Sequence, residues 1–165
     1  MSKVQELLKK VTTWSDSTVS DIVTECAKNE LLIPNSKNLD ATVLYEKLID
    51  GYLDHPGHTV ATLTTILSIL IPFYSHNATP NKYYYIGLYL LVLLGNKQSS
   101  EYYAMIDTIT PKDVIENIYI DYCMQIHFSI EQGSFAQLHA LLNGPSPHYQ
   151  SLLKMILDTL QYFTC

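Results

Sequence analysis

The sequence predicts an all-α protein, an α-solenoid of antiparallel helical hairpins related to tetratricopeptide-type stacks. Three observations support this class. Apolar residues recur at helical spacing along the chain, segments of helical length alternate with short turns rich in Pro, Gly or polar residues, and no stretch offers a convincing strand with a partner. Short turns between successive helices imply antiparallel packing. A plain globular helical bundle shares these features and stays open as an alternative.

The first part of the chain predicts three helices. Residues 3–12 form an amphipathic segment, Ser15 and Asp16 can cap a second helix, and Pro34 ends that pair. A third helix starts at about Asp40 and ends before the turn at 54–58. The residues expected to face inward are Val4, Leu7, Leu8, Val11, Val19, Ile22, Val23, Cys26, Val43, Leu44, Leu48 and Tyr52.

Two strongly apolar helices are expected next. Residues 59–74 form the first, and a polar loop at 75–80 leads to the second, which Gly95 and Asn96 stop. The second is apolar on most sides, which predicts that it lies in the middle of the fold. The residues expected inward are Val60, Leu63, Ile66, Leu67, Leu70, Tyr83, Ile86, Leu90, Leu93 and Leu94.

The following stretch predicts two further helices and one ambiguous segment. One helix carries Tyr102, Met105, Ile106 and Ile109 on one face. The next opens at Thr110, which can accept from free amides of the first turn, with Pro and Asp residues suited to a helix start. This helix is expected to end near residue 123. Residues 124–132 alternate like a strand but lack a partner strand, so we interpret them as a separate short helix ended by a glycine.

The C-terminal part predicts two more helices. Ser134 followed by Gln137 has the capping-box pattern. Residues 143–145, Asn-Gly-Pro, break the chain, and Ser146-Pro147 starts the last helix. The residues expected inward are Phe135, Leu138, Leu141, Leu142, Leu152, Leu153, Ile156, Leu157 and Leu160. The total is about ten helices in a single helical-repeat domain over residues 1–165.

The composition argues against several function classes. Apolar residues make up 47% of the chain and charged residues 16%, so apolar surface is expected to be shared with a partner. The net charge is −6, and the 10 Lys and Arg residues are scattered, which disfavours binding to nucleic acid or to an anionic membrane. The most hydrophobic run, residues 83–94, is too short to span a bilayer.

The cysteines and the N-terminus indicate a reducing compartment. The three cysteines form no CxxC pair and are odd in number, so a disulfide framework is not expected. The N-terminal ten residues contain no apolar signal core.

No constellation of residues predicts a cofactor, a metal ion or a catalytic centre. His55 and His58 flank a Pro-Gly pair, and only Asp54 lies near as a third ligand, so an exposed turn is the preferred interpretation. The sequence contains no glycine-rich phosphate loop following a strand. The carboxylates of Glu116, Asp121 and Glu131 do not share one helical face and are expected to be solvated.

The tyrosines are the one unusual feature of the composition. There are 13, and they crowd between residues 83 and 122. Tyrosine tolerates half-burial and is enriched in protein interfaces. Those at helical spacing with Leu and Ile are expected to pack between helix layers. Tyr85 and Tyr103 fall outside that spacing and are the candidates for contact with a partner.

The central stretch resembles a known family. Its sequence is similar to the middle of the smallest PCI-domain subunit of the 26S proteasome lid, the family of regulatory particle non-ATPase subunit twelve. The shared features are a leucine-rich helix ending near an Asn, an aromatic-containing helix, a Pro-x-Asp-(Ile/Val) start and an Asn-x-Tyr-Ile motif. Here they are residues 88–96, 101–109, 111–114 and 117–120.

Further matches follow in the same order along most of the chain. Residues 129–132 resemble the family's Ser-Leu-Glu-Gln, residues 133–135 its Gly-Ser-Tyr, and residues 156–160 its Leu-Leu-Asp-Thr-Ile. Residues 29–34 resemble an early loop. Two departures stand out. The family has more residues between the first two of these motifs, and the charged continuation of its last helix is replaced here by residues 161–163. The winged-helix module and C-terminal helix that follow in the family do not occur in residues 1–165, so we expect either a truncated sequence or a reduced relative.

The resemblance implies a non-catalytic interaction subunit without cofactors. It would lie in the lid beside another PCI-domain subunit, support lid assembly and docking to the base, and so serve ubiquitin-dependent protein degradation in the cytoplasm and nucleus. It would act as part of a hetero-oligomer. Functions carried by the family's C-terminal parts are not transferred to this chain.

Two other hypotheses stay open. A small PCI-type scaffold subunit of the COP9 signalosome or of translation initiation factor three would share the helical stack and differ in partners. A helical enzyme would instead gather in a pocket at least two of Cys123, His127, Glu131 and His139.

Overall fold

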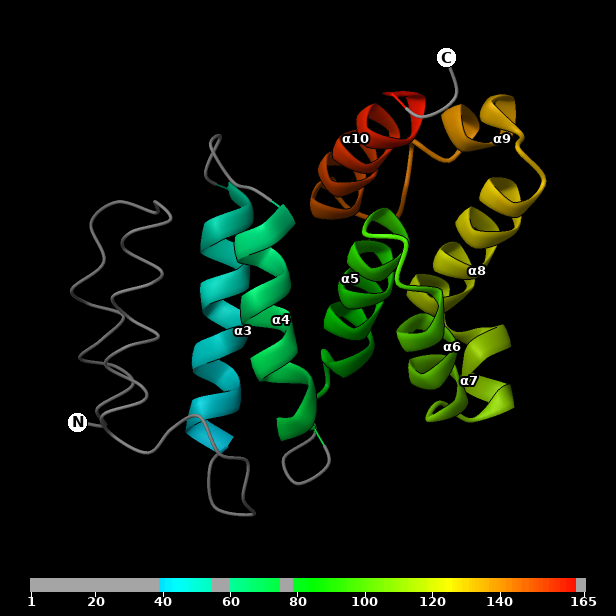
Figure 1. Ribbon diagram of the computed structural model, residues 1–165. Helices are drawn as coiled ribbons and strands as arrows, with labels where there is room; N and C mark the ends of the chain where they lie inside the picture. Colours follow the sequence, from blue (N-terminus) through cyan, green and yellow to red (C-terminus); the bar gives the residue numbers. More distant parts are fainter. Residues whose placement is uncertain (1–38, 55–59, 75–78, 163–165) are drawn as a thin grey trace. The chain divides into compact units, whose positions relative to one another are not determined.

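The computed structural model describes residues 39–54, 60–74 and 79–162, and all regular structure within these ranges is helical (Figure 1). The helices are α3 (Leu39–Asp54), α4 (Val60–Phe73), α5 (Lys82–Gly95), α6 (Ser99–Asp107), α7 (Pro111–Glu116), α8 (Ile118–Glu131), α9 (Phe135–Ala140) and α10 (Pro147–Tyr162). The predicted all-α solenoid class is confirmed for this part of the chain. The helices expected at 3–12 and 16–26 and the turn with His55 and His58 lie outside the described residues.

The chain divides into two compact units, Met1–Lys82 and Tyr83–Cys165. In the described part of the first unit, α3 and α4 run antiparallel and side by side (Figure 1). Their shared core includes the rings of Tyr45 and Phe73, whose centroids are 5.4 Å apart. The predicted inward residues Leu48, Tyr52, Leu63, Ile66, Leu67 and Leu70 are fully buried. Val43 and Val60 are only partly buried.

A buried carboxylate links three segments of the first unit, which the sequence pattern did not predict. Glu46 on α3 is only 6% exposed. Its Oε2 atom accepts hydrogen bonds from the hydroxyls of Tyr74 and Thr79, each at 2.6 Å. A buried carboxylate is tolerated when such donors replace water. Glu46 therefore ties the end of α4 and the segment before α5 to α3.

Helix α5 forms the centre of the second unit, as its sequence predicted. Leu88, Leu90, Leu91 and Val92 are fully buried, because neighbouring helices cover α5 on several sides. The thiol of Cys123 on α8 donates to the Gly87 carbonyl oxygen of α5 at 3.2 Å.

Tyr83 is an exception to the predicted burial of α5. It lies at the first turn of the helix and is only partly buried. Its hydroxyl donates to Asp113 Oδ2 at 2.7 Å. Its polar tip therefore reaches the start of α7 instead of the core.

Helix α5 ends where the sequence predicted, but a different residue reverses the chain. Gly95 is the last helical residue, and Lys97 adopts a left-handed φ of 59°. The Gln98 amide then donates to the Leu93 carbonyl oxygen at 2.9 Å, which closes the helix end. Gly95 itself serves packing, because a Cβ atom there would lie 2.8 Å from Cγ1 of Ile156 on α10.

The predicted helix start at Thr110 is confirmed, while the predicted extent of that helix is wrong. The Thr110 hydroxyl accepts from the Asp113 amide at 3.3 Å. The helix α7 then stops at Asn117, whose extended backbone has φ −79° and ψ 125°. Asn117 Oδ1 accepts from the amides of Tyr119 and Ile120 at 3.0 and 3.2 Å and so caps a new helix, α8.

Helix α8 runs without interruption through the stretch expected to begin a separate short helix. The helical interpretation of residues 124–132 is confirmed, and the expected break near residue 123 is wrong. The apparent alternation of that stretch reflects a helix with one solvent-exposed side. Ile126 is buried, Phe128 is exposed and Ile130 is half-buried.

The turn between α8 and α9 confirms half of the predicted capping box. The Ser134 hydroxyl accepts from the Gln137 amide at 3.4 Å. The Ser134 amide, however, donates to the Ser129 carbonyl oxygen at 2.9 Å instead of to the Gln137 side chain. Gly133 makes this turn possible with a φ of 66°. Leu138 is buried as expected, while Phe135, Leu141 and Leu142 are only partly buried.

Helix α10 closes the described part of the second unit. It begins at Pro147, as predicted. Leu152, Leu153, Ile156 and Leu157 are buried, in agreement with the predicted inward face.

Candidate partner-binding surface

The structure places the two candidate contact tyrosines in different environments. Tyr85 on α5 is only 4% exposed, whereas Tyr103 on α6 is 49% exposed. Contact with a partner stays a prediction for both. Tyr103 already presents its ring to solvent, while Tyr85 does not.

Most of the crowded tyrosines pack against one another inside the second unit. The rings of Tyr119 and Tyr149 stack at 5.2 Å with an interplanar angle of 14°. The ring of Tyr84 stands edge-on to both, at 5.0 and 5.3 Å. Tyr149 is fully buried, and its hydroxyl donates to the Tyr84 carbonyl oxygen. The cluster joins α5, α8 and α10, so its role is packing.

A glycine makes room for this cluster. A Cβ atom at Gly87 would meet the Tyr149 hydroxyl oxygen and would lie 3.3 Å from Tyr119 Cβ. Only glycine lets the tyrosine ring approach α5 this closely. Nothing in the local sequence pattern around Gly87 signals this requirement, because the contact joins residues 62 positions apart.

Burial keeps the nearby ionisable groups neutral. It raises the pKa of the Cys123 thiol and that of the Tyr149 hydroxyl. Thiolate is the nucleophilic form of cysteine, so a fully buried thiol with a raised pKa is poorly suited to attack a substrate.

The residues that a helical enzyme would use lie in different environments. His127 is buried beside the Tyr102 ring, with centroids 4.7 Å apart, and its Nε2 lies 2.9 Å from Tyr103 Oη. Glu131, one turn further along α8, has its carboxylate 3.6 Å from the same nitrogen. His139 is exposed on α9. None of these three residues, nor Cys123, lines the pocket described next.

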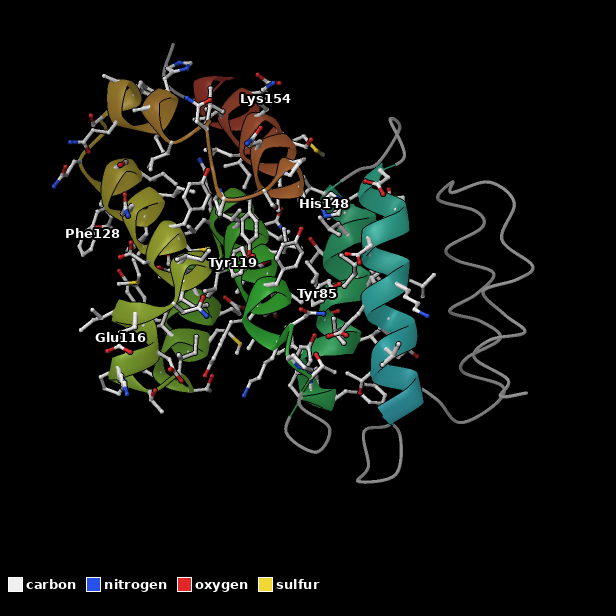
Figure 2. All side chains as sticks on the ribbon, turned by 180° about the vertical axis from the view of Figure 1, so that it is seen from behind. Tyr85, Glu116, Tyr119, Phe128, His148 and Lys154 are labelled. Carbon is white, nitrogen blue, oxygen red and sulfur yellow. The ribbon has the colours of Figure 1, made fainter. Side chains whose placement is uncertain are left out.

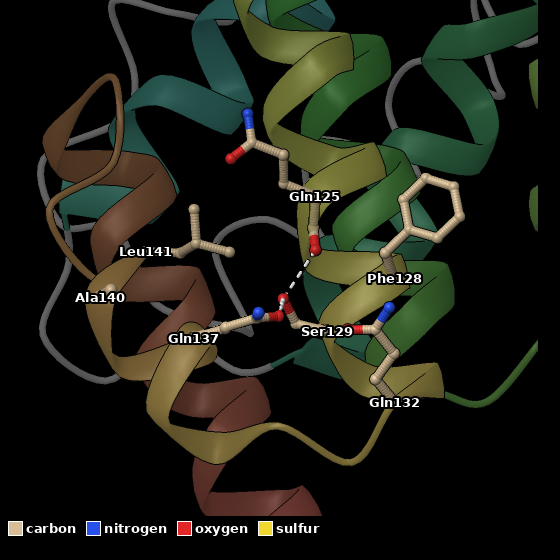
Figure 3. Close-up of a pocket in the computed structure, with 7 residues that line it drawn as sticks. All are labelled: Gln125, Phe128, Ser129, Gln132, Gln137, Ala140 and Leu141. Carbon is tan, nitrogen blue, oxygen red and sulfur yellow. Dashed lines mark hydrogen bonds between the residues drawn. The ribbon is translucent and has the colours of Figure 1, made fainter.

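An open groove of about 450 Å³ lies between α8 and α9 (Figure 3). The Ser129 hydroxyl donates to Gln137 Oε1 at 3.3 Å across it. Its walls combine carboxamides with apolar groups and contain no ionised side chain. The lining residues are Gln125, Phe128, Ser129, Gln132, Gln137, Ala140 and Leu141. A neutral groove of this kind suits another polypeptide better than a charged small molecule.

The large exposed apolar side chains of the described residues belong to three consecutive helices. The large hydrophobic side chains that stay exposed in the described residues are Tyr103 (49%), Ile115 (75%), Ile118 (62%) and Phe128 (56%). All four belong to the segment α6–α8, and Phe128 projects outward from α8 (Figure 2). We call this set the α6–α8 apolar surface. Exposed apolar groups concentrated on one segment are typical of interaction sites.

The same segment is strongly acidic. Residues 99–131 contain six Asp or Glu residues and a single Lys, Lys112. Glu116 and Glu131 are exposed and Asp121 is partly exposed, in agreement with the expectation that they form solvated positions. The segment that carries the exposed apolar side chains is thus also negatively charged, and its contact with a partner stays a prediction.

Metal-ion clusters and membrane-spanning helices are both absent from the described residues. No group of three or more His, Cys, Asp or Glu side chains there could hold a metal ion. Within the same residues, no helix combines the length and the apolar character needed to cross a membrane.

Sequence reasoning missed Ile115, Ile118 and Phe128 as surface residues. Helical periodicity assigns apolar residues to the core by default. For Ile118 and Phe128, the signal that could have identified them is the break at Asn117, because a new helix with its own phase starts there.

These features define a helical-repeat protein with a neutral groove and an exposed acidic and apolar surface, the properties of an interaction module. Residues 80–165, just over half of the chain, match the CSN8/PSMD8/EIF3K family, and the chain belongs to this family. It is also similar to 26S proteasome non-ATPase regulatory subunit 8 of Caenorhabditis elegans, with 29% identity over 82 residues. The match covers 49% of this chain and 33% of that protein, so this chain spans about a third of the length of the curated relative it matches.

Proposed function

We propose that the protein is a non-catalytic structural subunit of the 26S proteasome regulatory particle, placed in its lid. The observation that carries this proposal is the similarity to 26S proteasome non-ATPase regulatory subunit 8, and the family match over residues 80–165 supports it. The resemblance to regulatory particle non-ATPase subunit twelve, noted from separate motifs, supports the same complex.

The physical character of the second unit supports a subunit role. Its groove is neutral, its one described thiol is buried, and its large exposed apolar side chains all belong to the segment α6–α8. A surface of this composition is stabilised by covering it, as in the core of a protein interface. A proteasome subunit would cover it with neighbouring subunits.

The finer proposal names those neighbours. The protein would contact another PCI-domain subunit of the lid, support lid assembly and help to dock the lid to the base. It would thereby serve ubiquitin-dependent protein degradation in the cytoplasm and nucleus. Tyr103, which is already half-exposed, would be one of its contact residues.

The family gives one specific reason to keep a second candidate. Its description joins three names, CSN8, PSMD8 and EIF3K, so family membership alone does not choose among them. A scaffold subunit of the COP9 signalosome or of translation initiation factor three is therefore the alternative function.

The test is gentle affinity isolation of the tagged full chain from its native cells, followed by mass spectrometry of the co-isolated proteins. Recovery of proteasome lid and base subunits is the expected result. Recovery of signalosome or initiation-factor subunits in their place would move the function to the alternative. Recovery of none of these complexes would overturn the proposal of a structural subunit.

A further inference from the structure

The outward face of α8 carries a stripe of residues at the spacing used by packed helices. Its members follow one another at intervals of three and four residues, as in a heptad pattern. They are Ile118, Asp121, Gln125, Phe128 and Gln132. All are exposed or half-exposed, although the opposite face of the same helix is buried. We call these residues the α8 stripe.

The distance between the two apolar members of the stripe sets the minimum length of a partner segment that contacts both. Ile118 and Phe128 are ten residues apart, which corresponds to about 15 Å along the helix axis at about 1.5 Å per residue. Nearly three helical turns are therefore needed to contact both. The groove between α8 and α9 runs beside the second half of the stripe, because Gln125, Phe128 and Gln132 belong to both. A stripe beside a groove is the geometry that accepts an amphipathic helix.

The charge of the surface selects the chemistry of that helix. Asp121 lies within the stripe, and Gln125 Nε2 donates to its Oδ2 at 2.7 Å, so the carboxylate is held at this position. Exposed Glu116 precedes the stripe, and Glu131 at its far end has a side chain that is 59% exposed. Lys112 is the only Lys or Arg in residues 99–131. A basic partner would satisfy these carboxylates, and an acidic one would be repelled.

We propose that the α8 stripe and its groove bind a basic amphipathic helix of a partner protein. This helix has at least three turns, apolar residues that cover Ile118 and Phe128, and Lys or Arg residues that face Asp121 and its acidic neighbours. The inference deepens the proposed function and rests on it, since it assumes that the chain works inside a larger assembly. The contact that it adds is one between an acidic helix face of this chain and a basic helix of a neighbouring subunit.

Site-specific photo-cross-linking in the native cells tests the inference. The cross-linking amino acid p-benzoylphenylalanine replaces Ile118 or Phe128 in the full-length tagged chain. The matched control replaces Lys154, which is exposed on α10 and lies outside the stripe (Figure 2). The cross-linked peptides are then identified by mass spectrometry.

The expected result is that both stripe positions cross-link to one segment of one protein. That segment should be helix-forming and rich in Lys or Arg beside apolar residues, and Lys154 should not reach it. Asp121→Lys should reduce the cross-linking yield at Phe128 by about tenfold, because it replaces attraction by repulsion. Asp158→Lys, the same charge change at an exposed position of α10, should leave the yield unchanged.

The outcomes separate this inference from the proposed function. Proteasome subunits that co-isolate while the stripe cross-links to nothing, or to an acidic segment, would overturn the docking site and leave the function standing. A basic helix belonging to a signalosome or initiation-factor subunit would support the docking site and overturn the proteasome assignment. Equal cross-linking from Lys154 and the stripe to the same segment would also overturn the docking site.

Discussion

Gly87→Ala is expected to destabilise the second unit although it places a better helix former in a helix. The added Cβ would meet the Tyr149 hydroxyl oxygen, and the Tyr149 ring is fully buried and cannot move away freely. Overpacking a dense core costs about 1–3 kcal/mol. Loss of the hydrogen bond from Tyr149 to the Tyr84 carbonyl adds about 1 kcal/mol, and the helix propensity of alanine returns about 1 kcal/mol. The net destabilisation is about 1–3 kcal/mol.

A second substitution isolates the cause. Tyr149→Phe removes the hydroxyl that the new Cβ would meet. It should therefore lower the free energy of unfolding less in the Gly87→Ala variant than in the parent protein. The double variant should be more stable than the sum of the single effects by about 1 kcal/mol or more. The stability effects of substitutions at residues that do not touch add within about 0.5 kcal/mol, so a coupling of this size is measurable.

The assay is urea unfolding of the full chain followed by far-UV circular dichroism, with hydrogen exchange measured on peptides from α5 and α10. Faster exchange in both helices after Gly87→Ala is expected, because the substitution separates them. A stability gain of about 1 kcal/mol, as helix propensity alone would give, would refute the reasoning. Strict additivity with Tyr149→Phe would refute the contact between these two residues.

The remaining predictions concern helix ends and ionisable groups. Lys97→Gly should raise the free energy of unfolding by about 0.5–1 kcal/mol, because glycine adopts the left-handed backbone at this position without strain. Gly133→Ala should lower the free energy of unfolding by about 1 kcal/mol, because it places a Cβ atom on a left-handed backbone. Urea unfolding midpoints measure both effects. Asn117→Ala should lower stability by about 1 kcal/mol and speed amide exchange at the start of α8, since it removes the cap; unchanged exchange there would contradict the capping role. Burial raises the pKa of Cys123 and Tyr149 above their ordinary values of 9.0 and 10.0, so the folded state keeps protons that the unfolded chain releases. Stability should therefore be intact below about pH 9 and fall as the pH rises beyond it, and Cys123→Ala should make the fall shallower in urea titrations at increasing pH.

Local signals in the sequence predicted most of the helical elements. The cap at Thr110, the serine cap at Ser134 and the proline start of α10 depend on neighbouring backbone groups, so a short stretch of sequence contains all the necessary information. The buried centre of α5 was predictable for a related reason, since a helix that is apolar on most sides has no polar face to expose.

The missed features depend on contacts between distant residues or on helical phase. Asn117 lies inside an apolar pattern that continues on both sides, and only its side-chain capping reveals that one helix ends and another begins there. A new helix with its own phase starts there, and Ile118 and Phe128 face solvent although periodicity alone assigns apolar residues to the core. The close approach of Tyr149 to Gly87 could not be predicted without knowing that α10 packs on α5.

Exposed apolar side chains were expected, and their positions were only partly predicted; their contact with a partner stays a prediction. The low charge content indicated apolar surface to share, and Tyr103 was selected because it fell outside the core spacing; its half-exposed ring keeps it a candidate. Tyr85 was selected by the same reasoning, but α5 is covered on that side and leaves only 4% of the residue exposed. A single helix's spacing does not show which of its faces a neighbouring helix covers.

The most direct test of the central claim is the stoichiometry of the chain in complexes isolated from its native cells. Isotope-labelled reference peptides would quantify this chain and the lid subunits in the same native-gel band. A proteasome structural subunit should be equimolar with the other lid subunits and should stay so after a high-salt wash that removes loosely bound proteins. A chain that is far below equimolar with them, or equimolar with signalosome or initiation-factor subunits, would contradict the account.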